Sequence, residues 1–234
     1  MTELLFNGMN VARGAIDYFR RPEMREPWGG PFNGQAARRR LFEALCAALP
    51  LSVIVETGCY RGSTTEFFGR TGLTVFAAEA DAYAYGFARA RFLGRSNVKV
   101  LLSDSRAMLR RLLVGPRQRS DRQTQFFYLD AHWGEDLPLA EEIEIIFSRR
   151  PNAIVMIDDF AVPGDDGYRY DDYGPGKALT YAYICPLVAS FSLSVFYPST
   201  PSERDIGAKR GCVILVKSKE STDTLLKQPL LRQG

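Results

Sequence analysis

The chain has 234 residues, of which 46% are hydrophobic and 24% charged, with four cysteines and a single histidine. These proportions are typical of a soluble globular protein with one ordinary α/β domain, and they exclude a disordered or fibrous chain. One histidine excludes zinc centres that need two or three imidazole ligands. The cysteines are scattered and form no C-x-x-C pair, which predicts reduced thiols in a cytoplasmic protein and not a disulfide framework.

The charge balance gives little sign of a nucleic-acid partner. Thirty lysine and arginine residues nearly offset 27 aspartate and glutamate residues, for a net charge of +3. Arginines cluster at 38–40 and 149–150, and we interpret these clusters as solvated helix ends in preference to a polyanion site. No apolar run is long enough for a membrane span, and the N-terminus lacks the basic start and apolar stretch of a secretory signal.

Most of the chain alternates between strand-like and helix-like segments. Residues 1–34 are predicted to form an irregular N-terminal arm, because prolines and glycines interrupt them. A helix is expected over 35–49, where apolar residues recur at helical spacing. Five apolar strands are then expected at 51–57, 73–79, 98–103, 125–130 and 153–158, with helices at 63–69, 82–92, 105–113 and 138–147. This alternation predicts a parallel sheet with helices on both faces.

The C-terminal part breaks the alternation. A long loop is expected over 161–176 and a helix over 178–187. Two strands follow, 191–197 and 211–217, with no convincing helix between them, so they predict a terminal hairpin with one antiparallel strand. Ligands of such sheets bind outside the carboxyl ends of the strands, which makes the residues at those ends the candidates for a site.

The first strand runs into a glycine-containing loop, Glu56-Thr57-Gly58-Cys59-Tyr60-Arg61-Gly62-Ser63-Thr64. The loop reads G-x-x-x-G, whereas a dinucleotide site would read G-x-G-x-x-G. Glu56 would repel a pyrophosphate and would suit a cationic or amine-bearing ligand. A plain strand-to-helix turn is the alternative, and Ser63 is the expected N-cap of the following helix.

Acids also follow the second and third strands. Glu79 ends the second strand, with Asp81 just beyond it, and an acid at this place commonly accepts hydrogen bonds from ribose hydroxyls. Asp104 and Ser105 follow the third strand. Asp104 either accepts from an adenine amino group or caps the next helix, and taken singly it favours the capping role.

Together, E-T-G-x-x-x-G-S-T, the acid after strand two and the D-S pair after strand three resemble the class I S-adenosylmethionine-dependent methyltransferases over residues 35–217. The resemblance implies a Rossmann-like, doubly wound, seven-stranded sheet, with residues 1–34 as an arm or lid, 35–218 as the catalytic domain and 219–234 as a tail. It implies a glycine loop that holds the methionine part of the cofactor, a second-strand acid on ribose, and a third-strand acid with its neighbour facing adenine. The implied cofactor-binding residues are Glu56, Thr57, Gly58, Tyr60, Gly62, Ser63, Thr64, Glu79, Asp104, Ser105 and Asp130.

Three carboxylates follow the fourth and fifth strands. Asp130 ends one strand and Asp158 the neighbouring one, with Asp159 directly after it. We expect them to converge with no lysine or arginine between them, so that they would repel one another. A hard divalent cation such as Mg²⁺ or Ca²⁺ would relieve this repulsion. The alternative is that one or two of these acids cap helices or face water.

This arrangement is similar to that of the metal-dependent O-methyltransferases, especially the macrocin-type enzymes that methylate sugar hydroxyls of natural products. That resemblance implies Mg²⁺ ligands at Asp130, Asp158 and Asp159. The chain departs from the pattern at the position two residues after the first ligand, where the family often has an acid proposed as the base. His132 stands there.

His132 is the single histidine, and three roles are open to it. In an extended segment its side chain lies on the same side as that of Asp130, where a neutral imidazole could accept the proton of a substrate hydroxyl. A packed turn with Trp133 is the second option, and direct ligation of the metal is the third. The base is our first hypothesis, with Asp130 as its catalytic partner.

Two loops are candidates for the walls of a substrate site. Residues 165–176 combine tyrosines, aspartates and glycines, a mixture that suits polyhydroxyl or cationic substrates, although a solvated acidic surface loop has the same composition. Residues 30–35 could fold over the cofactor as a lid or serve only as a connector.

The sequence therefore predicts a cytoplasmic methyltransferase that acts on a hydroxyl of a sugar or another small molecule, with S-adenosylmethionine and Mg²⁺. The alternatives are a metal-independent methyltransferase, a nucleotide- or dinucleotide-binding oxidoreductase, and a non-catalytic binding module. No nucleic-acid or membrane partner is expected. A homo-oligomer in which the N-terminal arm packs on a neighbouring copy is an option.

Overall fold

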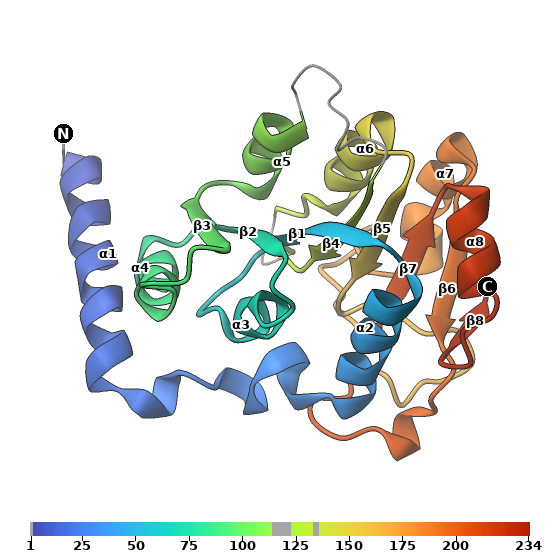
Figure 1. The fold of residues 1–234 in the computed structure, drawn as a ribbon, viewed down its shortest axis with the longest axis horizontal. Coiled ribbons are helices and arrows are strands. Elements are labelled where there is room, and N and C mark those ends of the chain that lie inside the picture. The colour runs from blue at the N-terminus through green and yellow to red at the C-terminus, as the bar shows by residue number, and fades with distance from the viewer. Residues whose placement is uncertain (1, 114–122, 133–135) are drawn as a thin grey trace.

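The computed structural model describes residues 2–113, 123–132 and 136–234. In this part of the chain one eight-stranded sheet forms the centre, in the order β3-β2-β1-β4-β5-β7-β6-β8 (Figure 1). The strands are β1 (Leu51–Thr57), β2 (Thr74–Glu79), β3 (Val98–Leu102), β4 (Thr124–Leu129), β5 (Ala153–Ile157), β6 (Ser194–Pro198), β7 (Val213–Val216) and β8 (Leu231–Gln233). The order reverses between β1 and β4, where sheets of this kind bind ligands.

The pairing confirms a mostly parallel sheet that ends in antiparallel strands. β1 pairs in parallel with β2 and β4, and β3 and β5 extend the parallel part on either side. β7 lies between β5 and β6 and is antiparallel to both. The sheet has one strand more than the expected seven, because β8 pairs with β6 from within the predicted tail. Three residues are too few to show a strand pattern in a sequence.

Helices cover both faces of the sheet (Figure 1). They are α2 (Ala36–Ala48), α3 (Ser63–Gly69), α4 (Ala82–Arg91), α5 (Ser105–Leu113), α6 (Leu139–Arg149), α7 (Tyr181–Phe191) and α8 (Lys219–Leu225). Neighbouring residues of β4 show how the two faces divide, because Phe127 packs with α5, α6 and α7 while Phe126 packs with α2, α3 and α8. This alternation lets one apolar strand supply two cores.

Gly62, and not Ser63, is the N-cap of α3. Gly62 has a left-handed backbone (φ 77°) and Ser63 is the first helical residue, so no side chain caps this helix. The N–H groups of the first helical turn therefore have no side-chain cap.

The expectation of an irregular arm is wrong for the first part of the chain. Residues Thr2–Arg20 form α1, which packs along α4 outside the sheet layers (Figure 1). The short 3₁₀ turns that follow, Pro22–Met24, Pro27–Gly29 and Pro31–Gly34, account for the proline and glycine signals. The sequence did not predict α1 because the helix precedes the strand–helix alternation and because its glycines weaken the helical pattern.

Close packing between α1 and α4 explains a glycine in each helix. A Cβ at Gly14 would overlap the carbonyl oxygen of Tyr83 in α4, and a Cβ at Gly86 would overlap that of Val11 in α1. The two helices therefore approach at a distance that only glycine permits. None of the described helices has the length and apolar character to span a membrane.

We predict that Gly14→Ala destabilises the protein by about 2 kcal/mol, because the added methyl group forces α1 away from α4. Gly8→Ala in the same helix is the matched control, since a Cβ there meets nothing within 4 Å. That change should stabilise the protein by up to about 1 kcal/mol through helix propensity. Urea unfolding and hydrogen exchange of residues 7–20 measure both effects, and equal responses of the two variants would contradict the packing role.

Candidate active site

The loop between β1 and α3 has a geometry that requires its first glycine. The N–H groups of Gly58 and Cys59 both donate to the carbonyl oxygen of Ala78 at 3.0 Å, which ties the loop to β2. Gly58 has a positive φ of 73°, and a Cβ there would overlap the carbonyl oxygen of Asp130. The glycine loop therefore lies directly against the residue that follows β4.

Glu79 braces this loop from the end of β2. Its Oε2 accepts from the N–H of Tyr60 at 2.7 Å and its Oε1 accepts from the N–H of Asp81 at 2.9 Å. Tyr60 has a left-handed backbone (φ 48°), so Glu79 holds a strained residue in place. Burial raises the pKa of the Glu79 carboxyl group.

Glu56 lies buried beneath the loop. The hydroxyl of Thr65 donates to its carboxylate, and no basic side chain pairs with it among the described residues. Burial raises the pKa of Glu56 to about 8, with a further contribution from the charge of Glu79. The carboxyl group therefore keeps its proton near neutral pH unless a cation binds beside it.

At the end of β3, Asp104 caps α5. Its Oδ1 accepts from the N–H groups of Arg106 at 2.9 Å and Ala107 at 3.2 Å, and the Arg106 guanidinium lies 2.7 Å from its Oδ2. The hydrogen bonds from Arg106 lower the pKa of Asp104. The capping alternative is thus the one observed, and a role toward adenine stays a prediction.

Ser105, beside that cap, is buried together with a carboxyl group that the sequence analysis missed. Glu142 of α6 is fully buried, and burial raises its pKa to about 7 against the effect of nearby hydroxyls on Ser105 and Thr57. The sequence feature that could have revealed Glu142 is its position on the apolar side of the predicted helix, beside Ile143.

Asp130, His132 and Asp159 come together beyond β4 and β5. One possible ligand atom from each lies within 4.8 Å of those of the other two, and His132 Nε2 is 3.7 Å from Asp130 Oδ1. Asp159 has a left-handed backbone (φ 52°) that turns it out of line with β5. Trp133, the predicted neighbour of His132, is outside the described residues.

The His132 ring is buried and uncharged. It is 2% exposed, and burial lowers its pKa, so the imidazole is neutral near pH 7. The hydroxyl of Tyr173 lies 2.6 Å from the His132 carbonyl oxygen and 2.5 Å from Asp171 Oδ2, and it donates to one of them at a time. The predicted loop 165–176 therefore does reach this group.

Asp158 has a different environment from the other two acids. It is fully buried, one carboxylate oxygen pairs with the Arg38 guanidinium, and the other accepts from the Tyr128 hydroxyl. The expectation that no basic side chain lies among these acids is wrong, because Arg38 pairs with Asp158. Arg38 lies 120 positions earlier in the chain, so the local sequence around the acids does not show this pair. In sequence, Arg38 shares a helix face with Leu41, Phe42 and Leu45, and this position among apolar residues was the missed signal.

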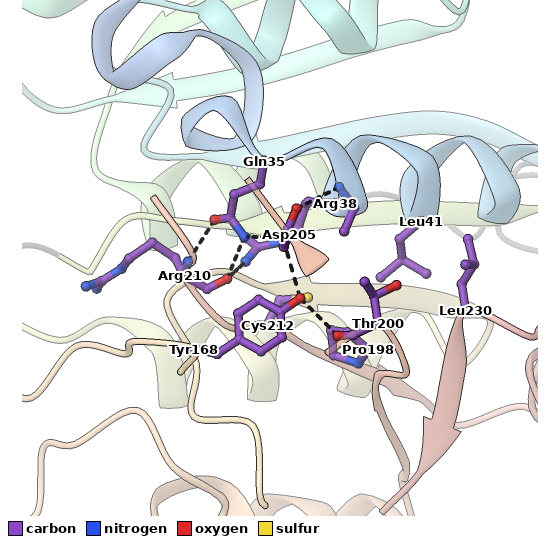
Figure 2. A pocket seen from close by; sticks show the side chains of 11 residues that line it. Gln35, Arg38, Leu41, Tyr168, Pro198, Thr200, Asp205, Arg210, Cys212 and Leu230 are labelled. Atoms are coloured by element: carbon purple, nitrogen blue, oxygen red, sulfur yellow. Dashed lines mark hydrogen bonds between the residues drawn. The ribbon is translucent and has the colours of Figure 1, made fainter. Parts of the chain in front are cut away.

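A second arginine pairs with Asp159. The Nε of Arg210 donates to Asp159 Oδ1 at 2.6 Å, and its guanidinium also pairs with Asp171. Gln35 holds Arg210 in place, because its Nε2 donates to the Arg210 carbonyl at 2.9 Å and its Oε1 accepts from the Arg210 N–H at 3.0 Å (Figure 2).

The same cluster fixes the start of α2. Asp205 Oδ1 accepts from the N–H of Ala37 at 3.0 Å, and its Oδ2 accepts from Gln35 Nε2 at 3.1 Å. Arg38, one residue after Ala37, donates to the carbonyl group of Arg210 (Figure 2) and to that of Gly211. The segment before β7 thus positions both arginines against the acids.

The structure brings the predicted groups to one edge of the sheet. The Asp130 N–H donates to the Thr57 carbonyl at 3.1 Å, so the acids and the glycine loop are in direct contact. Thr64 lies at the outer side, where its Oγ1 accepts from the N–H of Phe32 at 3.1 Å.

No protein-family model and no curated protein matches the sequence. Solved structures with a similar fold include an O-methyltransferase from Bacillus cereus in complex with SAH, with 16% identity, 78% of this chain and 80% of that chain covered, and a TM-score of 0.52. A proposed O-methyltransferase from Klebsiella pneumoniae has 15% identity, coverage of 78% and 81%, and a TM-score of 0.54. A structure concerned with the conversion of a disulfide bond into a thioacetal group during echinomycin biosynthesis has 21% identity, coverage of 86% and 90%, and a TM-score of 0.51. The chain thus has the α/β fold of S-adenosylmethionine-dependent methyltransferases.

We predict that Arg38→Gln lowers the free energy of unfolding by about 3 kcal/mol, because it leaves the Asp158 carboxylate buried without its counter-ion. The double change Arg38→Gln with Asp158→Asn should recover at least half of that loss. Urea unfolding of the three proteins measures it. A double variant no more stable than the single one would show that the guanidinium acts through packing and its carbonyl contacts.

Proposed function

We propose that this protein is an S-adenosylmethionine-dependent O-methyltransferase that methylates a hydroxyl group of a small molecule, with a divalent cation at the acid group. The observation that carries the proposal is the contact between the two halves of the site. Asp130 touches the glycine loop at Gly58 and Thr57, and it also meets His132 and Asp159. A methyl donor on the loop and a hydroxyl at the acids would therefore be neighbours.

The donor side combines features that suit a cationic, ribose-bearing molecule. Glu56 is a buried carboxyl group without a basic partner, which an ammonium group would stabilise in its charged form. Glu79 offers carboxylate oxygens at the end of β2, where ribose hydroxyls bind in sheets of this order. The resemblance to class I methyltransferases extends these roles to Tyr60, Gly62, Ser63 and Thr64 in the loop and to Asp104 and Ser105 at adenine.

The acid side fits a divalent cation. The Asp130 side chain is half-buried, at 32% exposed, and the loss of water around its carboxyl group raises its pKa, as do the charges of Asp159 and, when it is ionised, Glu56. A cation would relieve that repulsion, and when bound it would lower the pKa of a substrate hydroxyl and orient it. Asp130 and Asp159 would hold it. The predicted third ligand, Asp158, would first have to leave Arg38 and Tyr128.

In the proposed reaction the acceptor oxygen attacks the methyl carbon of the donor in line with the carbon–sulfur bond. The oxygen–carbon bond forms, the carbon–sulfur bond breaks, and its electron pair stays on sulfur, which becomes a neutral thioether. The hydroxyl proton leaves to a base. The sequence prediction assigns it to His132, and a neutral ring has the lone pair that this role requires.

The segment 27–34 supports a covering role for the N-terminal arm. The ring of Trp28 lies 5.0 Å from that of Tyr60 in the glycine loop, and Phe32 is buried against α3. Loop 165–176, with Tyr173 and Asp171 beside the acids, would form the acceptor side, and its composition suits a sugar hydroxyl.

Calorimetry on the full chain tests the donor. We expect S-adenosylmethionine to bind and NAD not to bind, because Glu56 lies where a pyrophosphate would pass. Methyl transfer from labelled donor to a panel of glycosides and other hydroxylated acceptors, with and without EDTA, tests the rest. Binding of NAD alone would favour an oxidoreductase. Transfer at full rate in EDTA would favour the metal-independent alternative.

The affinity for S-adenosylmethionine should fall as the pH is lowered. Glu56 has a raised pKa of about 8, so at lower pH its proton must leave before the carboxylate can pair with the donor's ammonium group. From about pH 7.5 to about pH 6 the affinity should approach a tenfold loss per pH unit, with proton release on binding. Calorimetry in buffers of different ionisation enthalpy measures both.

Glu56→Gln should bind the donor with little pH dependence over the same range. Glu43→Gln is the matched control, because Glu43 is exposed on α2, and it should behave as the unaltered protein does. A pH-independent affinity in the unaltered protein would remove Glu56 from the ammonium site.

A further inference from the structure

We infer that His132 is itself a ligand of the cation, so that one imidazole nitrogen and two carboxylates, from Asp130 and Asp159, form the site. Such a donor set favours Mn²⁺ or Co²⁺ over Mg²⁺. The inference rests on the proposed cation site and changes its ligands and its metal. A nitrogen that binds a cation has no lone pair left for a proton, so this role replaces the predicted one as the base.

The first observation is that the imidazole has no hydrogen-bond partner in the part of the chain that the structure describes. Both ring nitrogens of His132 are buried, and neither has a hydrogen-bond partner among the described residues. Leaving a buried polar group unpaired costs about 1–3 kcal/mol. Such a ring is expected where the missing partner is a ligand that the polypeptide does not supply.

The second observation is the distance between the donor atoms. His132 Nε2 and Asp130 Oδ1 are 3.7 Å apart, which is too far for a hydrogen bond. Two ligands at about 2.1 Å from one ion are about 3.0 Å apart when adjacent and about 4.2 Å apart when opposite. The 3.7 Å separation lies between these two values, and the three possible ligand atoms all lie within 4.8 Å of one another.

The third observation is that Asp158 is already engaged. Arg38 and Tyr128 take its two oxygens, and both the Arg38 and Asp158 side chains are almost fully buried, at 2% and 1% exposed. Asp159 keeps one oxygen free of Arg210, which pairs with its Oδ1. The third protein donor beside Asp130 and Asp159 is therefore the imidazole.

This donor set has a consequence for the metal. Mg²⁺ prefers oxygen ligands and keeps its waters, whereas imidazole nitrogen suits first-row transition ions. Compared with the predicted set of three aspartates, a site with His132 in place of Asp158 also has one negative charge fewer, and that charge would favour a hard cation. The Tyr173 hydroxyl, 2.6 Å from the His132 carbonyl oxygen, fixes the residue's backbone beside the acids.

The test uses metal alone on the full chain, without methyl donor, acceptor or polyhistidine tag. Because the protein has one histidine, ¹⁵N-histidine labelling identifies any imidazole coupling as that of His132. Electron spin-echo spectroscopy of the Mn²⁺-loaded protein should show ¹⁴N modulation that disappears on labelling. Competition calorimetry should give Mn²⁺ or Co²⁺ a roughly 100-fold higher affinity than Mg²⁺.

Variants test the role of His132 in Mn²⁺ binding independently. His132→Gln should lose the nitrogen modulation and bind Mn²⁺ at least about tenfold more weakly. Glu43→Gln is the control, because it removes an exposed acid of α2 outside the group, and it should bind Mn²⁺ as the unaltered protein does. If His132→Gln does not fold, the isotope experiment decides without it.

Two results would overturn the inference. Binding of Mn²⁺ without histidine coupling would return His132 to the role of base and leave the proposed methyl transfer and its cation in place. Absence of Mn²⁺ and Co²⁺ binding up to about 1 mM would remove the cation site itself. The separate measurement of S-adenosylmethionine binding would still decide the methyltransferase proposal.

Discussion

The structure depends on how it neutralises carboxyl groups that are buried or half-buried at one edge of a parallel sheet. Removing a carboxylate from water is costly unless a proton, a hydrogen-bond donor or a cation meets it. Asp158 has Arg38, Asp159 has Arg210, and Glu56 keeps its proton under a threonine hydroxyl. Asp130 is the member without a basic partner in the described chain, and it stands beside an imidazole that has no partner either.

The need for these counter-ions explains why remote segments are built into the site. α2 supplies Arg38, and the segment before β7 supplies Arg210, with Gln35 and Asp205 holding the two segments together. Asp205 also caps α2, so the helix start and the acids share one network. We therefore expect a change at the outer end of this network, at Asp205, to affect Asp158 and Asp159 through the two arginines.

Much of the fold could be predicted because it follows from local pattern. Short apolar runs such as 51–57 and alternating helices indicate a parallel sheet, and an acid directly after a strand must lie at the binding edge. This reasoning placed Asp130 and Asp158 at the ends of neighbouring strands, and in the structure they directly follow the paired strands β4 and β5. It could not show β8, whose three residues become a strand only by pairing with β6.

What the sequence could not show is which charged groups meet. Arg38 was interpreted as part of a solvated helix end, and its partner lies 120 positions away. Helix α1 was missed because Gly14 weakens a helical pattern, while the same glycine permits the close contact with α4 that stabilises the helix. In both cases the deciding energy comes from tertiary packing, which local propensity does not contain.

The contact between Thr57 and Asp130 joins the two halves of the site electrostatically as well as sterically. When Glu56 is ionised, above about pH 8, its negative charge is among those that disfavour the charged form of Asp130. A positive group bound beside either carboxylate therefore lessens the repulsion that the other one experiences. By linkage, above about pH 8 a bound cationic methyl donor and a metal cation at the acids would favour each other through these carboxylates, against the direct repulsion between the two positive charges. The neutral imidazole of His132, whose Nε2 lies 3.7 Å from Asp130 Oδ1, would fit this balance, because it would add a ligand without adding charge.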